Sequence, residues 1–100
     1  MLDSRVKFND SYEDKENETV TFYYLAPIDY IKTILGKEYK EAVALDISLE
    51  FPVDNIEADY VFAQASPVRE IEDGTESYDW SDIVLDKDDI NRLISLAEEI

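Results

Sequence analysis

The clearest pattern in this chain is the strict alternation of apolar and polar residues in the segment AVALDISLEF, residues 42–51. The odd-numbered residues from Val43 to Phe51 are all apolar, whereas positions 46, 48 and 50 are polar. Successive side chains of an extended chain point to opposite faces, so this period of two residues predicts a strand with one buried face. Pro52 is expected to end the strand, and its outward face carries Asp46 and Glu50.

Other segments predict further strands around this one. The run TVTFYYL is β-branched and aromatic, which favours a strand, and NDSYEDKENE before it is polar enough for a hairpin loop. ADYVFAQAS predicts a strand that ends at Pro67, and EIEDGTES predicts a loop that turns at Asp73-Gly74. The predicted strands besides residues 42–51 are Arg5–Phe8, Thr19–Leu25, Ala58–Ser66 and, as a short strand or extended segment, Tyr78–Leu85.

Two segments have the period of amphipathic helices. After Pro27, the sequence IDYIKTIL places its aliphatic residues on one face, and Gly36 is expected to end this helix. Near the C-terminus Asp86 is a candidate N-cap, followed by two acids that the helix dipole favours in the first turn. The apolar stripe of this second helix is Ile90, Leu93, Ile94 and Ala97.

The order of these elements predicts an α+β fold, a small mainly antiparallel sheet of about four to five strands with two helices packed on one face. One hundred residues fit a single acidic domain over positions 1–100. The chain has no cysteine, no apolar run long enough to span a membrane, and no apolar leader at its N-terminus. These features predict a cytoplasmic protein without a membrane partner, and they leave its oligomeric state open.

The charge is extreme and uneven. Twenty-five acidic and nine basic residues give a net charge of −16. Solubility of a small domain requires only roughly 2 to 8 units of charge. Residues 1–43 contain nine acids and six bases, whereas residues 44–100 contain sixteen acids and three bases. An excess of this size works against compactness, so its concentration in one half of the chain suggests a functional face.

The composition excludes much chemistry. With no histidine and no cysteine, the chain cannot build the common nucleophilic triads or the usual transition-metal sites. Its two glycines cannot form a phosphate-binding loop, and its net charge would repel DNA or RNA. The stretch REIEDGTE departs from a calcium-binding EF-hand loop, which leaves only an irregular calcium site as an alternative. We expect no catalytic residue, no metal and no cofactor, and therefore a protein that is not an enzyme.

Outward carboxylates on strands have a spacing that suggests a role. Residues i and i+2 of a strand project from one side about 6.6 Å apart, twice the strand rise, which is close to the separation of successive phosphates on a nucleic-acid strand. Such a surface attracts a groove lined with Lys and Arg. The candidate partner-binding acids are Asp46, Glu50, Asp59, Glu70, Glu72, Asp73, Glu76, Asp79 and Asp82. The competing interpretation is that these acids are ordinary solvated positions.

Aromatic residues accompany these acids. Tyr12 precedes Glu13 and Asp14 in a polar segment, and tyrosine is a common anchor at the centre of an interface. We therefore add Tyr12 to the candidate partner-binding residues. Trp80 lies within the acidic segment, but as the lone tryptophan of a small domain it is expected in the core.

In its size, its acidity, its lack of cysteine and its carboxylate-rich segment 70–89, the chain resembles the small DNA-mimicking inhibitors of mobile elements, of the anti-CRISPR and anti-restriction type. The resemblance implies a non-catalytic inhibitor that blocks a basic DNA- or RNA-binding groove. It implies an anti-CRISPR protein of a phage as the most specific function, with a Cas9-type nuclease as partner. The implied targets are Arg and Lys side chains that read a short duplex motif or hold the DNA backbone.

Two alternatives remain open from the residues themselves. An immunity or antitoxin protein would use the same electrostatics to neutralise one basic nuclease through a specific plug. A phage accessory protein with no nuclease target would carry its charge only for solubility.

Overall fold

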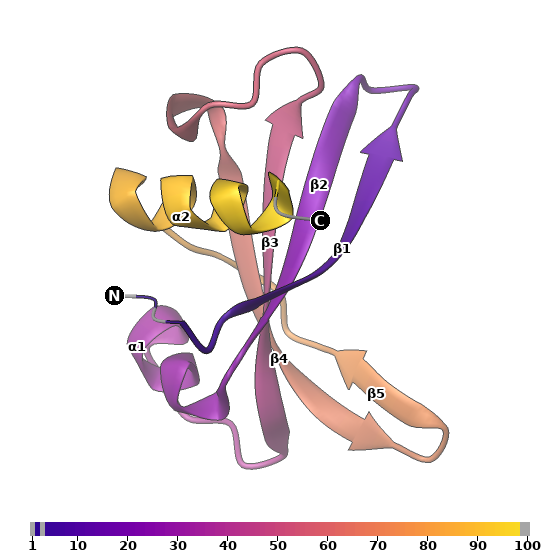
Figure 1. The fold of residues 1–100 in the computed structure, drawn as a ribbon. Helices are drawn as coiled ribbons and strands as arrows, with labels where there is room; N and C mark the ends of the chain where they lie inside the picture. Colours follow the sequence, from indigo (N-terminus) through magenta and orange to yellow (C-terminus); the bar gives the residue numbers. More distant parts are fainter. Residues whose placement is uncertain (1, 3, 99–100) are drawn as a thin grey trace.

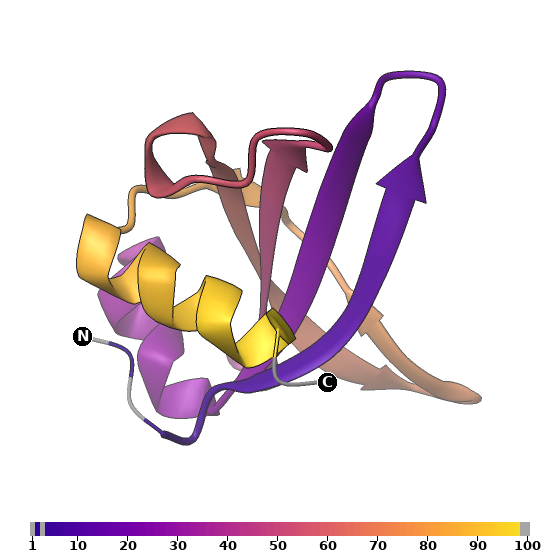
Figure 2. The ribbon, with the colours of Figure 1, turned by 45° about the horizontal axis from the view of Figure 1, so that its top comes forward.

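Strand β3 lies at the centre of an antiparallel sheet, and the two helices cover one face of that sheet (Figures 1 and 2). The computed structural model describes residue 2 and residues 4–98. Within these residues the sheet has six strands in the order β1-β2-β3-β4-β5, and the short β6 also pairs with β4. The elements are β1 (Lys7–Asp14), β2 (Thr19–Ala26), η1 (Ile28–Tyr30), α1 (Ile31–Leu35), β3 (Ala42–Pro52), η2 (Ala58–Tyr60), β4 (Phe62–Ile71), β5 (Gly74–Ser77), β6 (Ser81–Asp82) and α2 (Lys87–Glu98).

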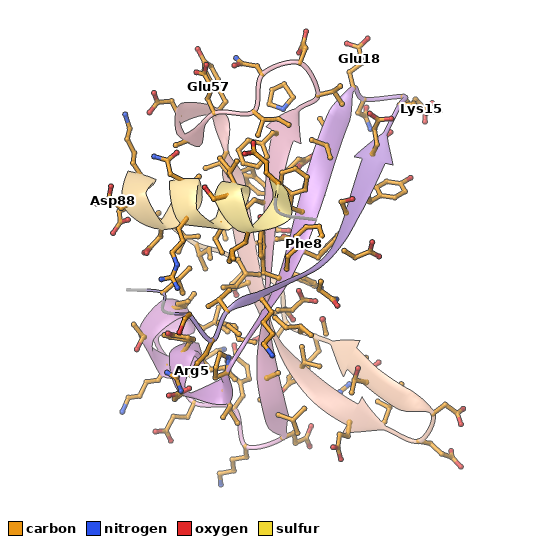
Figure 3. All side chains as sticks on the ribbon, in the orientation of Figure 1. Arg5, Phe8, Lys15, Glu18, Glu57 and Asp88 are labelled. Atoms are coloured by element: carbon orange, nitrogen blue, oxygen red, sulfur yellow. The ribbon has the colours of Figure 1, made fainter. Side chains whose placement is uncertain are left out.

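The core lies between the helices and one face of the sheet, which we call the inner face. The odd-numbered residues from Leu45 to Phe51 on β3 are fully buried there, which confirms the prediction from their alternation. Tyr24 on β2 pairs with Ile47, and Ile47 pairs with Ala65 on β4, so all three contribute to the same layer. The ring of Phe8 packs edge-on against Tyr24 with 5.6 Å between centroids, and Figure 3 shows Phe8 at the centre of the molecule.

Helix α2 is held to the sheet through both its side chains and its backbone. Ile90 and Leu93 are buried, and the backbone N–H of Asp89 donates to Asp86 Oδ1 at 2.8 Å, as expected for an N-cap. The hydroxyl of buried Tyr24 donates to the carbonyl of Leu93 at 2.5 Å. The N-terminal segment closes this side of the core, because the N–H of Leu2 donates to Asp89 Oδ1 at 3.3 Å.

The predicted class, an α+β fold with an antiparallel sheet, is confirmed, but the predicted number of strands is too small. The acidic segment expected to be a loop before Thr19 is largely strand β1, with an irregularity between Phe8 and Asp10 in its pairing with β2. The segment EIEDGTES forms the end of β4, a turn at Glu72-Asp73 and β5. Acidic side chains do not end a strand when they project from a face of the sheet that is open to water.

Pro67 does not end its strand, contrary to the prediction, because β4 continues to Ile71. Its carbonyl accepts from Tyr78 N–H at 3.0 Å, so its nitrogen points toward the same edge of β4. At that edge β6 pairs with β4 only as far as Ala65, and the pairing of β5 with β4 starts at Val68, so no neighbouring strand requires an N–H from position 67. Proline is tolerated in a sheet at such a gap.

Three smaller predictions also fail. Val43 was expected inside but is 46% exposed, because a bulge between Ala42 and Ala44 turns it outward. The segment Ala58–Tyr60 is a 3₁₀ turn, and its strand begins only at Phe62. In the first helical segment Gly36 adopts φ 78° and ends α1 as expected, whereas Ile28 is 49% exposed.

We expect Leu93→Ala to destabilise the protein by about 2–5 kcal/mol, because it leaves a cavity between α2 and the sheet. That is a large share of the roughly 5–15 kcal/mol typical of a domain. The exposed Ser95 lies on the same helix, and Ser95→Ala should change stability by less than about 0.5 kcal/mol. Urea unfolding followed by circular dichroism measures both variants. Equal stability of the two variants would show that α2 does not close the core.

Candidate partner-binding surface

The face of the sheet opposite the helices, here called the outer face, is the candidate functional surface. Strand pairing places one row of side chains across it from five strands. This row consists of Asp10, Tyr23, Ser48, Gln64 and Asp82. Both ends of the row are carboxylates, and residues between them are polar or aromatic.

A second row lies beside the first and is rich in aromatic residues. It consists of Tyr12, Thr21, Glu50 and Phe62, from β1 to β4. Tyr12 is 61% exposed and Phe62 is 49% exposed. Among strand residues that the structure describes, Lys7 at the start of β1 is the one base whose pairing places it on this face. The outer face therefore combines carboxylates with exposed rings.

The outer face is hollowed where Trp80 folds over it. The cavity has a volume of about 360 Å³, and Trp80 is one of its walls. Its other lining residues are Thr21, Tyr23, Ser48, Glu50, Phe62 and Gln64. Trp80 is 41% exposed, so the expectation that it belongs to the core is wrong. It contributes to a surface cavity instead.

The connection between β5 and β6 positions Trp80. Asp79, directly before it, has φ 55°, a left-handed conformation that turns the chain sharply. Its carboxylate accepts from the Tyr39 hydroxyl at 2.5 Å and lies 3.4 Å from the Lys37 ammonium. These two contacts lower the pKa of Asp79, the Tyr39 hydrogen bond most strongly. Tyr39 and Lys37, in the loop after α1, therefore hold Asp79 and the connection in place.

Tyr23 lies at the centre of the carboxylates on the outer face. It is opposite Asp10 on β1 and Ser48 on β3, and Asp46 and Glu50 flank Ser48 two residues away on either side. Burial raises the pKa of Tyr23, and the charges of Asp46, Glu50 and Asp10 raise it further. The smaller contribution, from the three carboxylates, reflects their convergence around one side chain.

Asp46 is the least solvated of these acids. Ser77 Oγ donates to its Oδ2 at 2.8 Å, but its Oδ1 is buried and has no hydrogen-bond partner in the described residues. Burial raises the pKa of Asp46, and the hydrogen bond from Ser77 partly offsets this rise. The strand β5 therefore folds over this end of the outer face and covers one of the predicted partner-binding acids.

The structure divides the predicted partner-binding residues among separate parts of the molecule. Tyr12, Asp46, Glu50 and Asp82 lie on the outer face. Glu70, Glu72, Asp73 and Glu76 lie on the β4–β5 hairpin, which extends away from the helices (Figure 1). Asp59 lies in η2, where its carboxylate is 2.7 Å from the ammonium of Lys87 at the start of α2.

Several of these acids interact with bases of the same chain. Glu76 accepts from Arg69 Nε at 2.7 Å, and Arg69 also lies 3.3 Å from Glu41. Exposed ion pairs of this kind contribute little to stability, but they neutralise the acids for long-range attraction. In contrast, the carboxylates that strand pairing places on the outer face, Asp10, Asp14, Asp46, Glu50 and Asp82, form no ion pair within the described residues.

Other acids are distributed around the molecule. Figure 3 shows Glu18 at the β1–β2 turn, Glu57 before η2 and Asp88 at the first turn of α2, at separate points of the periphery. They are exposed, and they belong to no part of the outer face. The solvated-surface interpretation therefore fits these acids, whereas the outer face and the β4–β5 hairpin are the places where carboxylates converge.

The sequence pattern did not single out several residues of the outer face, and it favoured a core position for Trp80. The residues without a predicted role are Asp10, Thr21, Tyr23, Ser48, Phe62 and Gln64. Tyr23 could have been found, because Thr21, Tyr23 and Leu25 alternate with buried residues in the predicted strand. Asp10 follows the irregularity in β1, and Trp80 depends on the left-handed Asp79. Neither of these backbone features has a signal in the local sequence pattern.

No group of three or more acidic side chains in the described residues is arranged to hold a metal ion. The helices that the structure describes are all too short or too polar to cross a membrane. Comparison of the chain with family models, with curated proteins and with solved structures gives no match.

We expect Asp46→Asn to stabilise the protein at pH 7. Because the pKa of Asp46 is raised in the folded state, ionisation of its carboxyl group opposes folding as the pH rises above its ordinary value of 3.8. Asparagine has no such ionisation and keeps an acceptor for Ser77. The gain should shrink as the pH falls toward 3.8, as measured by urea unfolding at several pH values.

Ser77→Ala is the counterpart of that variant. It removes the one donor to a half-buried carboxylate, so it should destabilise the protein by about 1–3 kcal/mol at pH 7. If Asp46→Asn instead lowers stability at pH 7, the ionised carboxylate is stabilised by the fold and this account of Asp46 is wrong.

Tyr39→Phe should loosen the connection that carries Trp80, because it removes the hydroxyl that holds Asp79 but keeps the ring that packs against Tyr78. Trp80 is the one tryptophan of the chain, so its fluorescence anisotropy reports this change directly. We expect a lower anisotropy with little change in Tm. Tyr60→Phe, at an exposed tyrosine in η2, is the control and should leave the anisotropy unchanged.

Proposed function

We propose that this protein is a non-catalytic inhibitor whose outer face occupies a basic nucleic-acid-binding groove of another protein and excludes nucleic acid from it. One observation carries the proposal: Asp10, Glu50 and Asp82, whose carboxylates form no ion pair in the described residues, lie on the open face of a sheet next to exposed aromatic rings. A sheet holds them at fixed separations, so little conformational entropy is lost on binding. The acids supply attraction and the rings supply anchors.

The most specific form of the proposal is an anti-CRISPR protein of a phage that binds a Cas9-type nuclease. This form is supported by the resemblance in size and acidity to small DNA-mimicking inhibitors, and by the carboxylates of the outer face. Lys and Arg side chains that contact the DNA backbone or read its motif would face the carboxylates of Asp10, Glu50 and Asp82. The hairpin acids Glu72 and Asp73 would extend the negative surface at its far end.

An immunity or antitoxin protein that neutralises one basic nuclease is the second candidate. The cavity beside Trp80 favours it, because a specific plug requires a shaped contact as well as charge. The two candidates differ in their dependence on salt. A mimic held mainly by exposed charges weakens steeply as salt rises, whereas a plug with desolvated anchors weakens less.

We expect the protein to displace labelled duplex DNA from a Cas9-type nuclease, as measured by fluorescence anisotropy, and added salt should reduce the displacement. Removing three outer-face charges with Asp10→Asn, Glu50→Gln and Asp82→Asn should weaken binding to the nuclease at least about tenfold at low salt. These replacements keep side-chain shape, so circular dichroism should be unchanged.

The matched control removes three exposed carboxylates away from the outer face, with Glu16→Gln, Glu57→Gln and Glu98→Gln. It has the same net charge as the outer-face variant and should retain most of the affinity. A third variant, Glu72→Gln with Asp73→Asn, measures how much the β4–β5 hairpin contributes to binding of the nuclease. Displacement from colicin-type nucleases alone would favour the immunity protein. Failure to displace DNA from any nuclease of a panel would exclude the proposed function.

A further inference from the structure

The cavity on the outer face has a chemistry more specific than negative charge. At about 360 Å³ it lies at the small end of ligand sites, which span roughly 300–1,000 Å³, so it suits a single side chain or a small molecule. Three rings contribute to its walls, those of Tyr23, Phe62 and Trp80. Phe62 and Trp80 remain substantially exposed, which is costly for large apolar groups unless a partner covers them.

The polar groups of the cavity include several acceptors and no cation. Glu50 contributes a carboxylate without an ion pair in the described residues. Gln64 donates its amide nitrogen to Asp82 Oδ1 at 3.0 Å, which leaves its carbonyl oxygen as an acceptor. The residues that line the cavity, all of them described, include no Lys or Arg. The cavity therefore suits a ligand that carries hydrogen-bond donors and a positive charge.

Ser48 adds a further polar group to the wall of the cavity. It lies on the cavity wall, is only 8% exposed, and its hydroxyl has no hydrogen-bond partner among the described residues. The Ser48 oxygen itself is not completely buried, so it is open to the cavity and can accept a hydrogen bond from a ligand. Ser48 is also directly opposite Tyr23 and Gln64 in the sheet, so its hydroxyl belongs to the middle of the cavity.

We propose that this cavity binds the side chain of an arginine from a partner protein, with the guanidinium between the aromatic rings and the carboxylate of Glu50. A guanidinium is planar, stacks on aromatic faces and presents five N–H donors, which match the acceptors of Glu50, Ser48 and Gln64. The inference deepens the proposed function and rests on it for the kind of partner, a basic nucleic-acid-binding protein. It assigns a particular residue type to the centre of that contact.

Other occupants fit the cavity less well. A lysine ammonium is more strongly hydrated than a guanidinium, and it offers three donors without a flat surface for stacking. A nucleobase would stack on the rings, but its phosphates would meet the carboxylates of Asp10, Glu50 and Asp82. A neutral planar group would use the rings and would gain nothing from the charge of Glu50. These three occupants are separate outcomes of the experiment below.

Trp80 provides the measurement, because the only tryptophan of the chain forms a wall of the cavity. The protein is titrated with three blocked tripeptides that differ at the middle residue: acetyl-Gly-Arg-Gly-amide, its lysine analogue and its citrulline analogue. Citrulline has the shape of arginine without its charge. We expect a saturable fluorescence change with the arginine peptide and about tenfold weaker binding of the other two. Equal responses to arginine and citrulline, or none that saturates, would overturn the inference.

Two variants sharpen the test. Glu50→Gln keeps the shape of the side chain and should weaken arginine binding at least about fivefold, while Glu57→Gln removes a carboxylate elsewhere and should leave it unchanged. Ser48→Ala should leave the fluorescence of the free protein unchanged. It should weaken binding of the arginine peptide more than binding of the lysine peptide. Unchanged arginine affinity in Glu50→Gln would contradict the assigned contact. Urea unfolding of each variant shows whether the fold is retained.

The peptide titration is independent of any nuclease, so the two proposals fail separately. Arginine binding that depends on Glu50, without displacement of DNA from any nuclease, would support the arginine site and remove only the proposed function. DNA displacement without arginine binding would overturn the arginine site and leave the acidic face as the inhibitor surface. A stronger response to a short single-stranded DNA than to the arginine peptide would also overturn the inference.

Discussion

Burial of one face of β3 is the constraint on which the rest of the structure depends. Leu45, Ile47, Leu49 and Phe51 have no exposed surface, and a shift of one residue in strand pairing would move all four to water. The same constraint therefore sets the register of β2 and β4 against β3. The same register places Asp46, Ser48 and Glu50 on the opposite face, and this placement does not depend on interactions of their own side chains. A hydrophobic layer on one side thus places a charged surface on the other.

The net charge of −16 has different consequences in different parts of the molecule. Arg69 and Lys37, from separate parts of the chain, lie beside Glu76 and Asp79, and these local pairs reduce repulsion near the β4–β5 hairpin. On the outer face the described carboxylates have no such pairs, so repulsion between them remains. Burial raises the pKa of Tyr23, and the charges of Asp46, Glu50 and Asp10 raise it further. A cationic partner relieves the repulsion between these carboxylates when it binds, which makes the free energy of binding more favourable.

The elements with a local signal could be predicted from the sequence. The alternation from Val43 to Phe51 predicted the central strand and the outward acids Asp46 and Glu50, and Asp86 was recognised as the N-cap of the last helix. The failures have non-local causes. Pro67 continues a strand because of a gap between two neighbouring strands, and Trp80 reaches the outer face because Asp79 is held by Tyr39, 40 residues earlier. Likewise, the pairing of Glu76 with Arg69 depends on a hairpin that was expected to be a loop.

The attachment of α2 to distant parts of the chain affects how the molecule is assembled. Leu2 contacts Asp89 across 87 positions, and Tyr24 contacts Leu93 across 69. The inner face of the sheet therefore stays incomplete during synthesis until the last helix has emerged, and contacts of such long range form slowly. Over that interval the apolar side chains of the strands are open to other molecules, and the repulsion between like-charged nascent chains would then protect them from aggregation.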